Sequence, residues 1–140
     1  MPECYLLALA QSSSLDAETN NFSLFGLIEE VAVPGPNAFL PLEFHAYWKF
    51  APEELNVAFE IRLRLTDGKT DHPSPVTSLQ SSTARLRGRG AGLRIPGPGQ
   101  WNLLADWRLP DGEWTAGTIR WPLTVKTTQT QGPDNSQPAS

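Results

Sequence analysis

Apolar and polar residues alternate with a period of two along several stretches, which is the pattern of strands that bury one face. Residues 40–50 place apolar side chains at even positions, and residues 55–65 place them at odd positions. Residues 4–11 and 83–95 predict two further strands. Residues 22–33 are apolar on both sides, which predicts a central strand with a bulge or close backbone approach at Gly26. Whether residues 76–86 form an edge strand or no strand stays open.

Residues 97–125 hold four of the five tryptophans and the clearest hairpin signal. The turn is residues 109–113, LPDGE, where proline pre-sets the first turn angle and glycine supplies a positive φ. This turn predicts a register in which Trp107 faces Thr115, Leu103 faces Ile119 and Trp101 faces Trp121. The face that carries these residues is predicted to be core, and the opposite face is predicted to point to water.

This spacing of strands and turns predicts an all-β protein, a two-sheet antiparallel β-sandwich of the immunoglobulin-like or C2-like kind with seven or eight strands. Thirteen prolines and eleven glycines suit such a fold better than a helical bundle. The chain of 140 residues has room for one domain, predicted over residues 1–125. The tail 126–140 offers no apolar side chain to bury, so we predict disorder there.

The charge of the chain argues against two classes of partner. A net charge of −4 repels nucleic acid and anionic membranes, so an anion site must be local. Cys4 is the single cysteine and has no internal partner for a disulfide. The apolar residues 5–10 are too few, and follow the wrong flanking residues, for a signal peptide or a membrane span. These features predict a cytoplasmic protein.

Four arginines in the segment RLRGRGAGLR form the strongest local charge feature. On a strand, Arg85, Arg87 and Arg89 share one face, where they can bind a phosphate, a carboxylate or an acidic partner. Charges on an exposed edge strand can instead protect it against aggregation, and on sequence alone we favour this protective role. No helix is predicted to follow the glycines between the arginines, whereas a phosphate-binding loop needs a helix N-terminus after its glycines.

Other combinations of polar residues predict little chemistry. Asp67, Asp71 and His72 lie in one turn segment, but an acidic solvated turn explains them better than a cation site, and we predict neither metal nor cofactor. The serines lack a neighbouring histidine or a nucleophile elbow, so we predict no enzyme. Trp114 lies opposite Arg108, which predicts a cation–π pair rather than a sugar-binding platform.

The order of the segments resembles a family of small uncharacterised bacterial β-sandwich domains. The resemblance covers residues 4–125 and is carried by the steps Leu24-Phe25-Gly26 and Pro98-Gly99-Gln100-Trp101, the second one residue tighter than is typical. These are backbone motifs of low specificity. The resemblance implies the fold and no catalytic residue.

These observations predict a non-catalytic interaction module that binds a protein partner or self-associates, with a small-ligand binder for carbohydrate or a phosphorylated metabolite as the alternative. The predicted surfaces are a sheet edge and the outward faces of the strands. The candidate binding residues are Arg85, Arg87, Arg89, Arg108, Trp114, Arg120, His45 and Tyr47.

Overall fold

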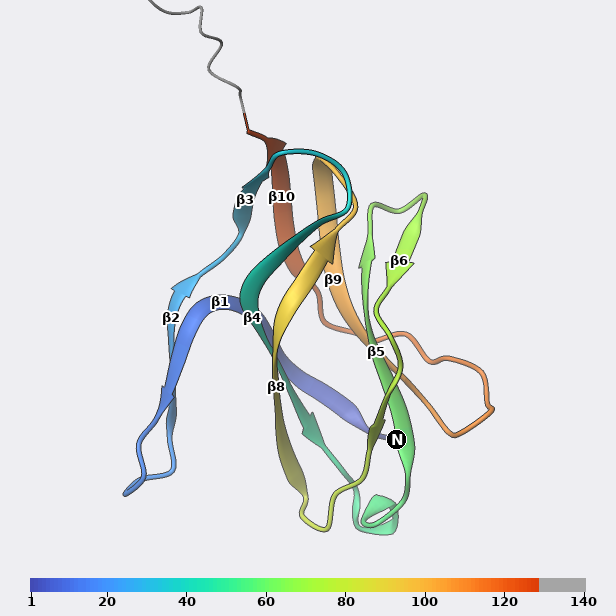
Figure 1. Cartoon of the computed structure of the whole chain (residues 1–140). Coiled ribbons are helices and arrows are strands. Elements are labelled where there is room, and N and C mark those ends of the chain that lie inside the picture. The colour runs from blue at the N-terminus through green and yellow to red at the C-terminus, as the bar shows by residue number, and fades with distance from the viewer. Residues whose placement is uncertain (129–140) are drawn as a thin grey trace, which may run out of the picture.

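The computed structural model describes residues 1–128 as ten strands in two sheets (Figure 1). Sheet A has the order β2-β1-β4-β8, and sheet B has the order β3-β10-β9-β5-β6, with β7 also paired to β5. Sheet A contains β1 (Glu3–Leu15), β2 (Phe22–Leu27), β4 (Ala38–Lys49) and β8 (Arg85–Ile95). Sheet B contains β3 (Glu30–Val33), β5 (Phe59–Thr66), β6 (Asp71–Pro73), β7 (Thr77–Leu79), β9 (Gly99–Arg108) and β10 (Trp121–Thr127).

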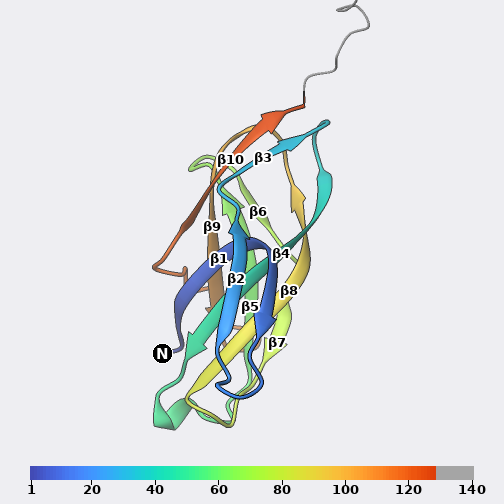
Figure 2. The same cartoon turned by 90° about the vertical axis from the view of Figure 1, so that its left-hand side faces the viewer.

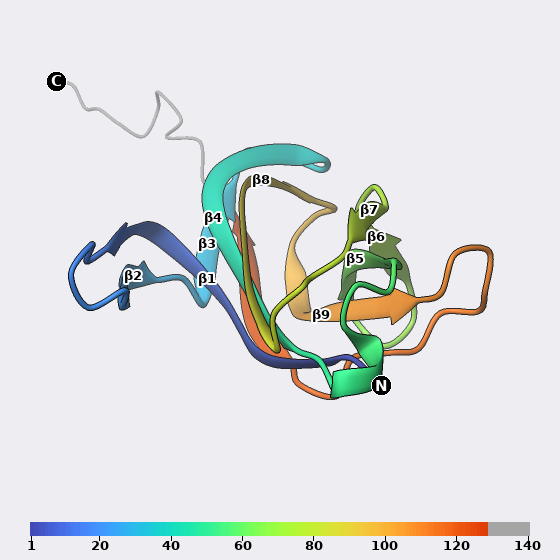
Figure 3. The same ribbon diagram turned by 90° about the horizontal axis from the view of Figure 1, so that it is seen from below.

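The strands of the two sheets form two layers in the view from below (Figure 3), and the core residues lie between these layers. Leu9 and Trp48 of sheet A and Leu65, Leu103 and Leu123 of sheet B are at most 2 % exposed. Except for Leu9, each comes from a stretch whose alternation predicted an inward position, and burying such a side chain stabilises the fold by roughly 1.5–3 kcal/mol. The all-β sandwich is therefore confirmed.

The predicted strand at residues 22–33 is wrong, because the chain there forms two strands in two different sheets. β2 is an edge strand of sheet A, and after a break at residues 28–29 β3 joins sheet B (Figure 2). β3 runs parallel to β10, so the sandwich is not wholly antiparallel. Splitting this segment, together with the short strands β6 and β7, gives ten strands where seven or eight were predicted. Gly26 has a φ of 65° and passes close to the Gln11 side chain, as predicted for a close backbone approach.

The C-terminal hairpin keeps its predicted faces but not its full register. Trp107 pairs with Thr115 as predicted, whereas Leu103 pairs with Trp121 in place of Ile119. The five residues 116–120 therefore lie opposite the three residues 104–106, an excess of two, and the Gly117 amide donates to Asp106 Oδ1. Because the shift is two residues, the alternation of side chains survives. Trp101 and Leu103 are buried as predicted, while Ile119 and Trp121 are only partly buried.

Three boundaries also differ from the sequence prediction. A short 3₁₀ turn, η1 (Pro52–Glu54), precedes the predicted strand 55–65, whose first four residues, 55–58, form no strand, and β5 begins at Phe59. Of residues 76–86, the segment Thr77–Leu79 forms β7 on sheet B and Arg85 begins β8. β10 extends to Thr127, beyond the predicted domain end, because it pairs with β3 and Lys126 Nζ lies 2.9 Å from Glu30 Oε2. The remaining predicted tail, residues 129–140, lies outside the described residues.

Within residues 1–128, no helix has the length and apolar character needed to cross a membrane.

Candidate functional site

The arginine run lies on β8, which is an edge strand of sheet A. Antiparallel pairing with β4 places Arg85 opposite Lys49, Arg87 opposite Tyr47 and Arg89 opposite His45. The three arginines share the outer face of the sheet and are exposed, as their spacing predicted. We call these three residues the arginine ladder. Leu86, Gly88 and Gly90 alternate with them and face the space between the sheets, where they are half-buried.

None of the arginines in the ladder lies within ion-pair distance of a carboxylate among residues 1–128. Arg62, Arg64 and Arg108 on sheet B differ, because each has an aspartate or glutamate partner. Exposed guanidinium groups without a carboxylate retain their donors for an external anion. The ladder is thus a local positive strip on an acidic protein.

The hairpin of β1 and β2 curls over one side of the ladder. β1 bends strongly as it leaves β4, so that β2 and the hairpin turn lie beyond the sandwich (Figures 1 and 3). Arg87 Nη2 donates to the Asn20 carbonyl at 2.7 Å, and Arg89 Nη1 donates to Ser13 Oγ at 3.2 Å. The Arg87 guanidinium also lies 5.1 Å from the centre of the Phe22 ring, within cation–π range. These contacts orient the ladder without neutralising it.

His45 and Tyr47 were predicted to face water, and this prediction is wrong. They do point to the outer face of sheet A, but Phe22 of β2 packs on both rings, with centroid separations of 6.4 and 6.3 Å. His45 is 0 % exposed and Tyr47 9 %. The small side chain of Ala8, opposite His45 on β1, leaves room for the histidine ring. The two residues therefore lie beneath the covered part of the face, and a partner cannot contact them directly.

Beneath this cover, His45 Nε2 lies 3.0 Å from Glu43 Oε1. A hydrogen bond with Ser13 holds the pKa of the Glu43 carboxyl below its ordinary value, with smaller help from His45 and Arg89. His45 Nδ1 and Tyr47 Oη are buried and have no hydrogen-bond partner among the described residues. Through the hydrogen bond between Ser13 and Glu43, this group links β1 to β4.

A cavity of about 430 Å³ opens where the ladder meets the hairpin turn. It is lined by Tyr5, Asn20, Phe22, Arg85, Leu86 and Arg87. Two aromatic rings and two guanidinium groups suit an anionic ligand with an apolar part.

A second, larger cavity of about 500 Å³ lies on the inner side of β8, between the edges of the two sheets. Its lining is mostly apolar and includes Phe44, Ala46, Ile61, Leu79, Gly88 and Leu93. Gly90 is required nearby, because a Cβ there would lie 2.2 Å from the Phe44 ring that packs over it. β8 pairs only with β4 in the described part of the chain, so every second residue directs its backbone N–H and C=O away from the sheet.

Arg108, Trp114 and Arg120 are not part of this site. Trp114 is held between Arg108 and Arg62, whose guanidinium carbons lie 4.3 and 4.4 Å from its ring centre. The predicted Arg108–Trp114 cation–π pair is therefore confirmed, on the outer face of sheet B. Arg120 is exposed in the loop between β9 and β10. Of the residues predicted as one outward surface, His45 and Tyr47 thus belong to sheet A and Arg108 to sheet B, while Trp114 and Arg120 lie in the loop between β9 and β10.

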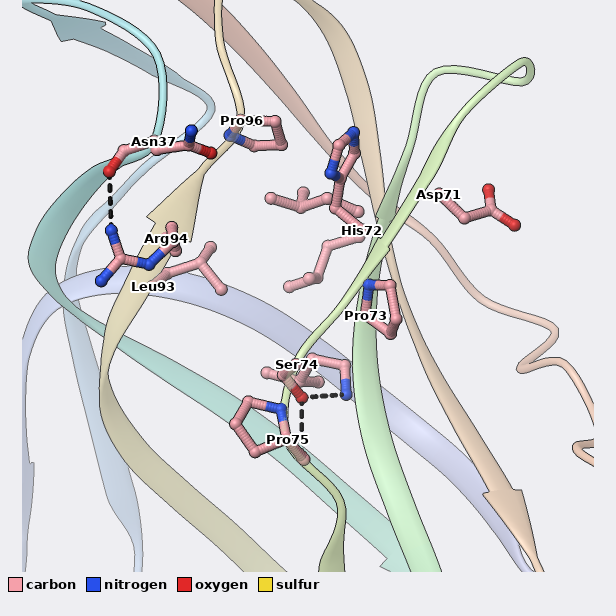
Figure 4. Close-up of a pocket in the computed structure, with 12 residues that line it drawn as sticks. Asn37, Asp71, His72, Pro73, Ser74, Pro75, Leu93, Arg94 and Pro96 are labelled. Atoms are coloured by element: carbon pink, nitrogen blue, oxygen red, sulfur yellow. Dashed lines mark hydrogen bonds between the residues drawn. The ribbon is translucent and has the colours of Figure 1, made fainter.

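The aspartates and histidine of the turn segment do not converge either. Asp67 Oδ1 accepts hydrogen bonds from the Lys69 and Thr70 amides, and these bonds hold the pKa of that carboxyl below its ordinary value. His72 packs edge-on against Trp101, with a centroid separation of 5.3 Å. Asp71 and His72 both line a pocket of about 310 Å³, and Figure 4 shows the Asp71 carboxylate pointing away from the His72 ring. No group of three or more metal-ligating side chains occurs within residues 1–128.

Compared with models of known protein families and with curated proteins, the sequence gives no match. The resemblance to small bacterial β-sandwich domains therefore stays a prediction.

Proposed function

We propose that this domain is a non-catalytic, cytoplasmic interaction module that binds an acidic segment of a partner protein through the arginine ladder. One observation carries the proposal. Three exposed arginines occupy alternating positions of an open edge strand, without a carboxylate ion partner in the described part of the chain. In a protein of net charge −4, such a strip attracts an acidic segment while the remaining surface repels it.

The protective role that we favoured from the sequence is compatible with this proposal. Pairing of β8 with β8 of a second copy would place arginines of like charge beside one another, which is unfavourable. The same charges that oppose self-pairing favour an acidic strand. Self-association through this edge is therefore the less favoured form of the interaction.

The test is binding of a fluorescent peptide of alternating glutamate and serine, followed by anisotropy at low and high salt. The variant Arg85→Ser/Arg87→Ser/Arg89→Ser should weaken binding by roughly tenfold or more, because three ion pairs are lost. A matched variant, Lys69→Ser/Arg120→Ser/Lys126→Ser, removes the same number of positive charges elsewhere and should leave binding within about twofold. Equal loss in both variants would reduce the effect to net charge and contradict the proposal.

A small phosphorylated ligand is the second candidate, favoured by the cavity between the ladder and the hairpin turn. Titration with inorganic phosphate and with a sugar phosphate, followed by the intrinsic fluorescence of the protein, tests it. Saturable binding that is lost in Arg85→Ser/Arg87→Ser would support this candidate. A carbohydrate platform has no such support, since Trp48 and Trp101 are buried and Trp114 is held between two arginines.

A further inference from the structure

The outer and inner faces of β8 carry different side chains, and this difference indicates which residues the partner segment should contain besides acidic ones. The outer side carries the arginine ladder, and the inner side carries Leu86, Gly88 and Gly90, of which Gly88 lines the apolar cavity of about 500 Å³. Because side chains of a strand alternate between faces, a strand added beside β8 would present every second residue to each environment. Its residues opposite the arginines would favour carboxylates, and its residues opposite the glycines would favour apolar side chains.

We infer that the partner binds by strand addition to β8, as an extended segment in which acidic and apolar residues alternate. The inference rests on the proposed function and adds the mode of binding. Three features carry it: the unpaired backbone of the edge, the charge complementarity of the ladder, and an apolar cavity that continues the inner face of the same strand.

The glycines of β8 shape the inner half of this surface. Leu86 is followed at the next inward positions by Gly88 and Gly90. Phe44 packs over Gly90, whereas the inner face at Gly88 opens onto the cavity. Glycines in a strand often mark a place where another chain approaches closely. Apolar side chains of an added strand can therefore enter the cavity, which Leu79 of β7 and Ile61 of β5 close from the opposite sheet. Burying them there contributes affinity that the exposed ion pairs alone do not provide.

A second copy of the chain is a poorer occupant. Strand β8 alternates arginine with leucine and glycine, so its own edge offers no carboxylates to the ladder. Like charges beside one another on paired strands are destabilising. The edge strand β2 carries exposed Phe25 and Leu27 but also lacks acidic residues. The edge strands β3 and β6 of sheet B do carry Glu30 and Asp71, but Glu30 pairs with Lys126 and Asp71 with Arg64. Charge complementarity therefore favours a different protein as the partner.

The experiment uses the whole chain and peptides of about nine residues, a length that nearly spans β8. The first peptide alternates glutamate with valine, and the second alternates glutamate with serine. The valine peptide should bind roughly tenfold more tightly, because only its apolar residues fill the cavity. Equal affinities would overturn the inference.

Backbone pairing is tested with two N-methylated forms of the valine peptide, each methylated at one of the two alternating sets of residues. Only the residues whose amides face β8 donate backbone hydrogen bonds to that strand. One form should therefore lose binding, and the other should retain it. Slower amide hydrogen exchange in residues 85–91 of the protein should accompany binding of the intact peptide. Equal binding of both methylated forms would overturn strand addition.

The cavity is tested with Thr77→Trp, an exposed position of β7 that lines its mouth. The matched control is Ser78→Trp, which is also exposed on the same strand but is not part of the lining. Both variants should melt close to the parent protein, and only the first should weaken the valine peptide, by roughly tenfold. Equal binding by the two variants would overturn the cavity as the apolar subsite.

The outcomes separate this inference from the proposed function. If every acidic peptide binds, depends on the arginine ladder and ignores both N-methylation and Thr77→Trp, the ladder binds acidic segments without strand addition. If no acidic peptide shows binding that depends on the ladder, the proposed function and the inference both fail.

Discussion

Replacing Asp106 with alanine should destabilise the domain strongly, although the residue lies on a face that the sequence predicted to point to water. Its side chain is 1 % exposed. It accepts hydrogen bonds from Arg62 Nε at 3.0 Å, from Arg64 Nε and Nη2 at 2.7 and 3.2 Å, and from the Gly117 amide at 3.3 Å. The substitution would remove all of these bonds and leave two guanidinium groups without this partner.

The size of the effect follows from the exposure of the arginines. Breaking a buried ion pair by removing one partner costs about 3–5 kcal/mol. The side chains of Arg62 and Arg64 are 22 % and 13 % exposed, so water can partly solvate the remaining charges. We therefore expect a loss near the lower limit, about 3 kcal/mol. Asp106→Asn keeps the shape but not the charge and should cost less.

The assay is urea unfolding followed by tryptophan fluorescence. With a slope of about 1–3 kcal/mol per molar urea, the midpoint should fall by roughly 1–3 M. The control is Glu60→Ala, which removes the ion-pair partner of Arg108. Both side chains of this pair are about a quarter exposed. Such a pair is worth only about 0.2–1 kcal/mol. Similar midpoints for the two variants would refute the reasoning, since burial would then make no difference.

The dependence on pH supplies a second readout for the same residue. Burial alone would raise the pKa of Asp106, but the hydrogen bonds from Arg64 and Arg62 outweigh burial and hold it below its ordinary value. A carboxyl with a lowered pKa in the folded state contributes its full stability above the ordinary pKa of about 4 and loses it as the pH falls further. The difference between the parent protein and Asp106→Ala should therefore shrink below about pH 4 and stay constant near neutrality.

Three further predictions concern packing and burial. Trp101→Ala should cost about 3–5 kcal/mol and Trp121→Ala clearly less, because only the first ring is fully buried; equal shifts in the urea midpoint would contradict the observed burial. Gly117→Ala should lower the melting temperature, since its Cβ would lie 2.3 Å from the Ala105 carbonyl oxygen; an unchanged melting temperature would mean that the loop shifts freely. Burial raises the pKa of the Cys4 thiol to about 11 from 9.0, so the folded protein should react slowly with a thiol reagent at pH 8 and should lose stability between about pH 9 and 11. If the folded protein reacted as fast as a denatured sample, the burial of this thiol would be contradicted.

Alternation along the chain determined the fold class, most strand positions and the inward faces of β4, β5 and β9. These features follow from the period-two geometry of a strand, which requires no knowledge of its neighbours. The same rule placed the three arginines of the ladder on one face and paired Arg108 with Trp114 across the hairpin. A face, once assigned, survives even the two-residue shift between β9 and β10, because the shift preserves parity.

Tertiary structure alone decided which outward faces are covered. His45 and Asp106 both sit on outward positions, and both are fully buried. Phe22, brought over sheet A by the bend of β1, covers His45, whereas Arg62, Arg64 and the loop after β9 cover Asp106. Alternation records only the side of a sheet to which a residue points. What lies on that side depends on contacts between segments that are far apart in the sequence.

The local pattern of apolar and polar residues also did not predict which sheet each strand joins. Nothing in residues 22–33 signals that the chain leaves sheet A and enters sheet B between β2 and β3, because both strands have the same apolar character. Strand order also decided that β8 is an edge and that an apolar cavity lies on its inner side. The sequence alone determined that arginines alternate with glycines on β8. Their position at an unpaired edge above a cavity depended on the packing of the two sheets, since only that packing determines which backbone groups and apolar surfaces remain open to a partner.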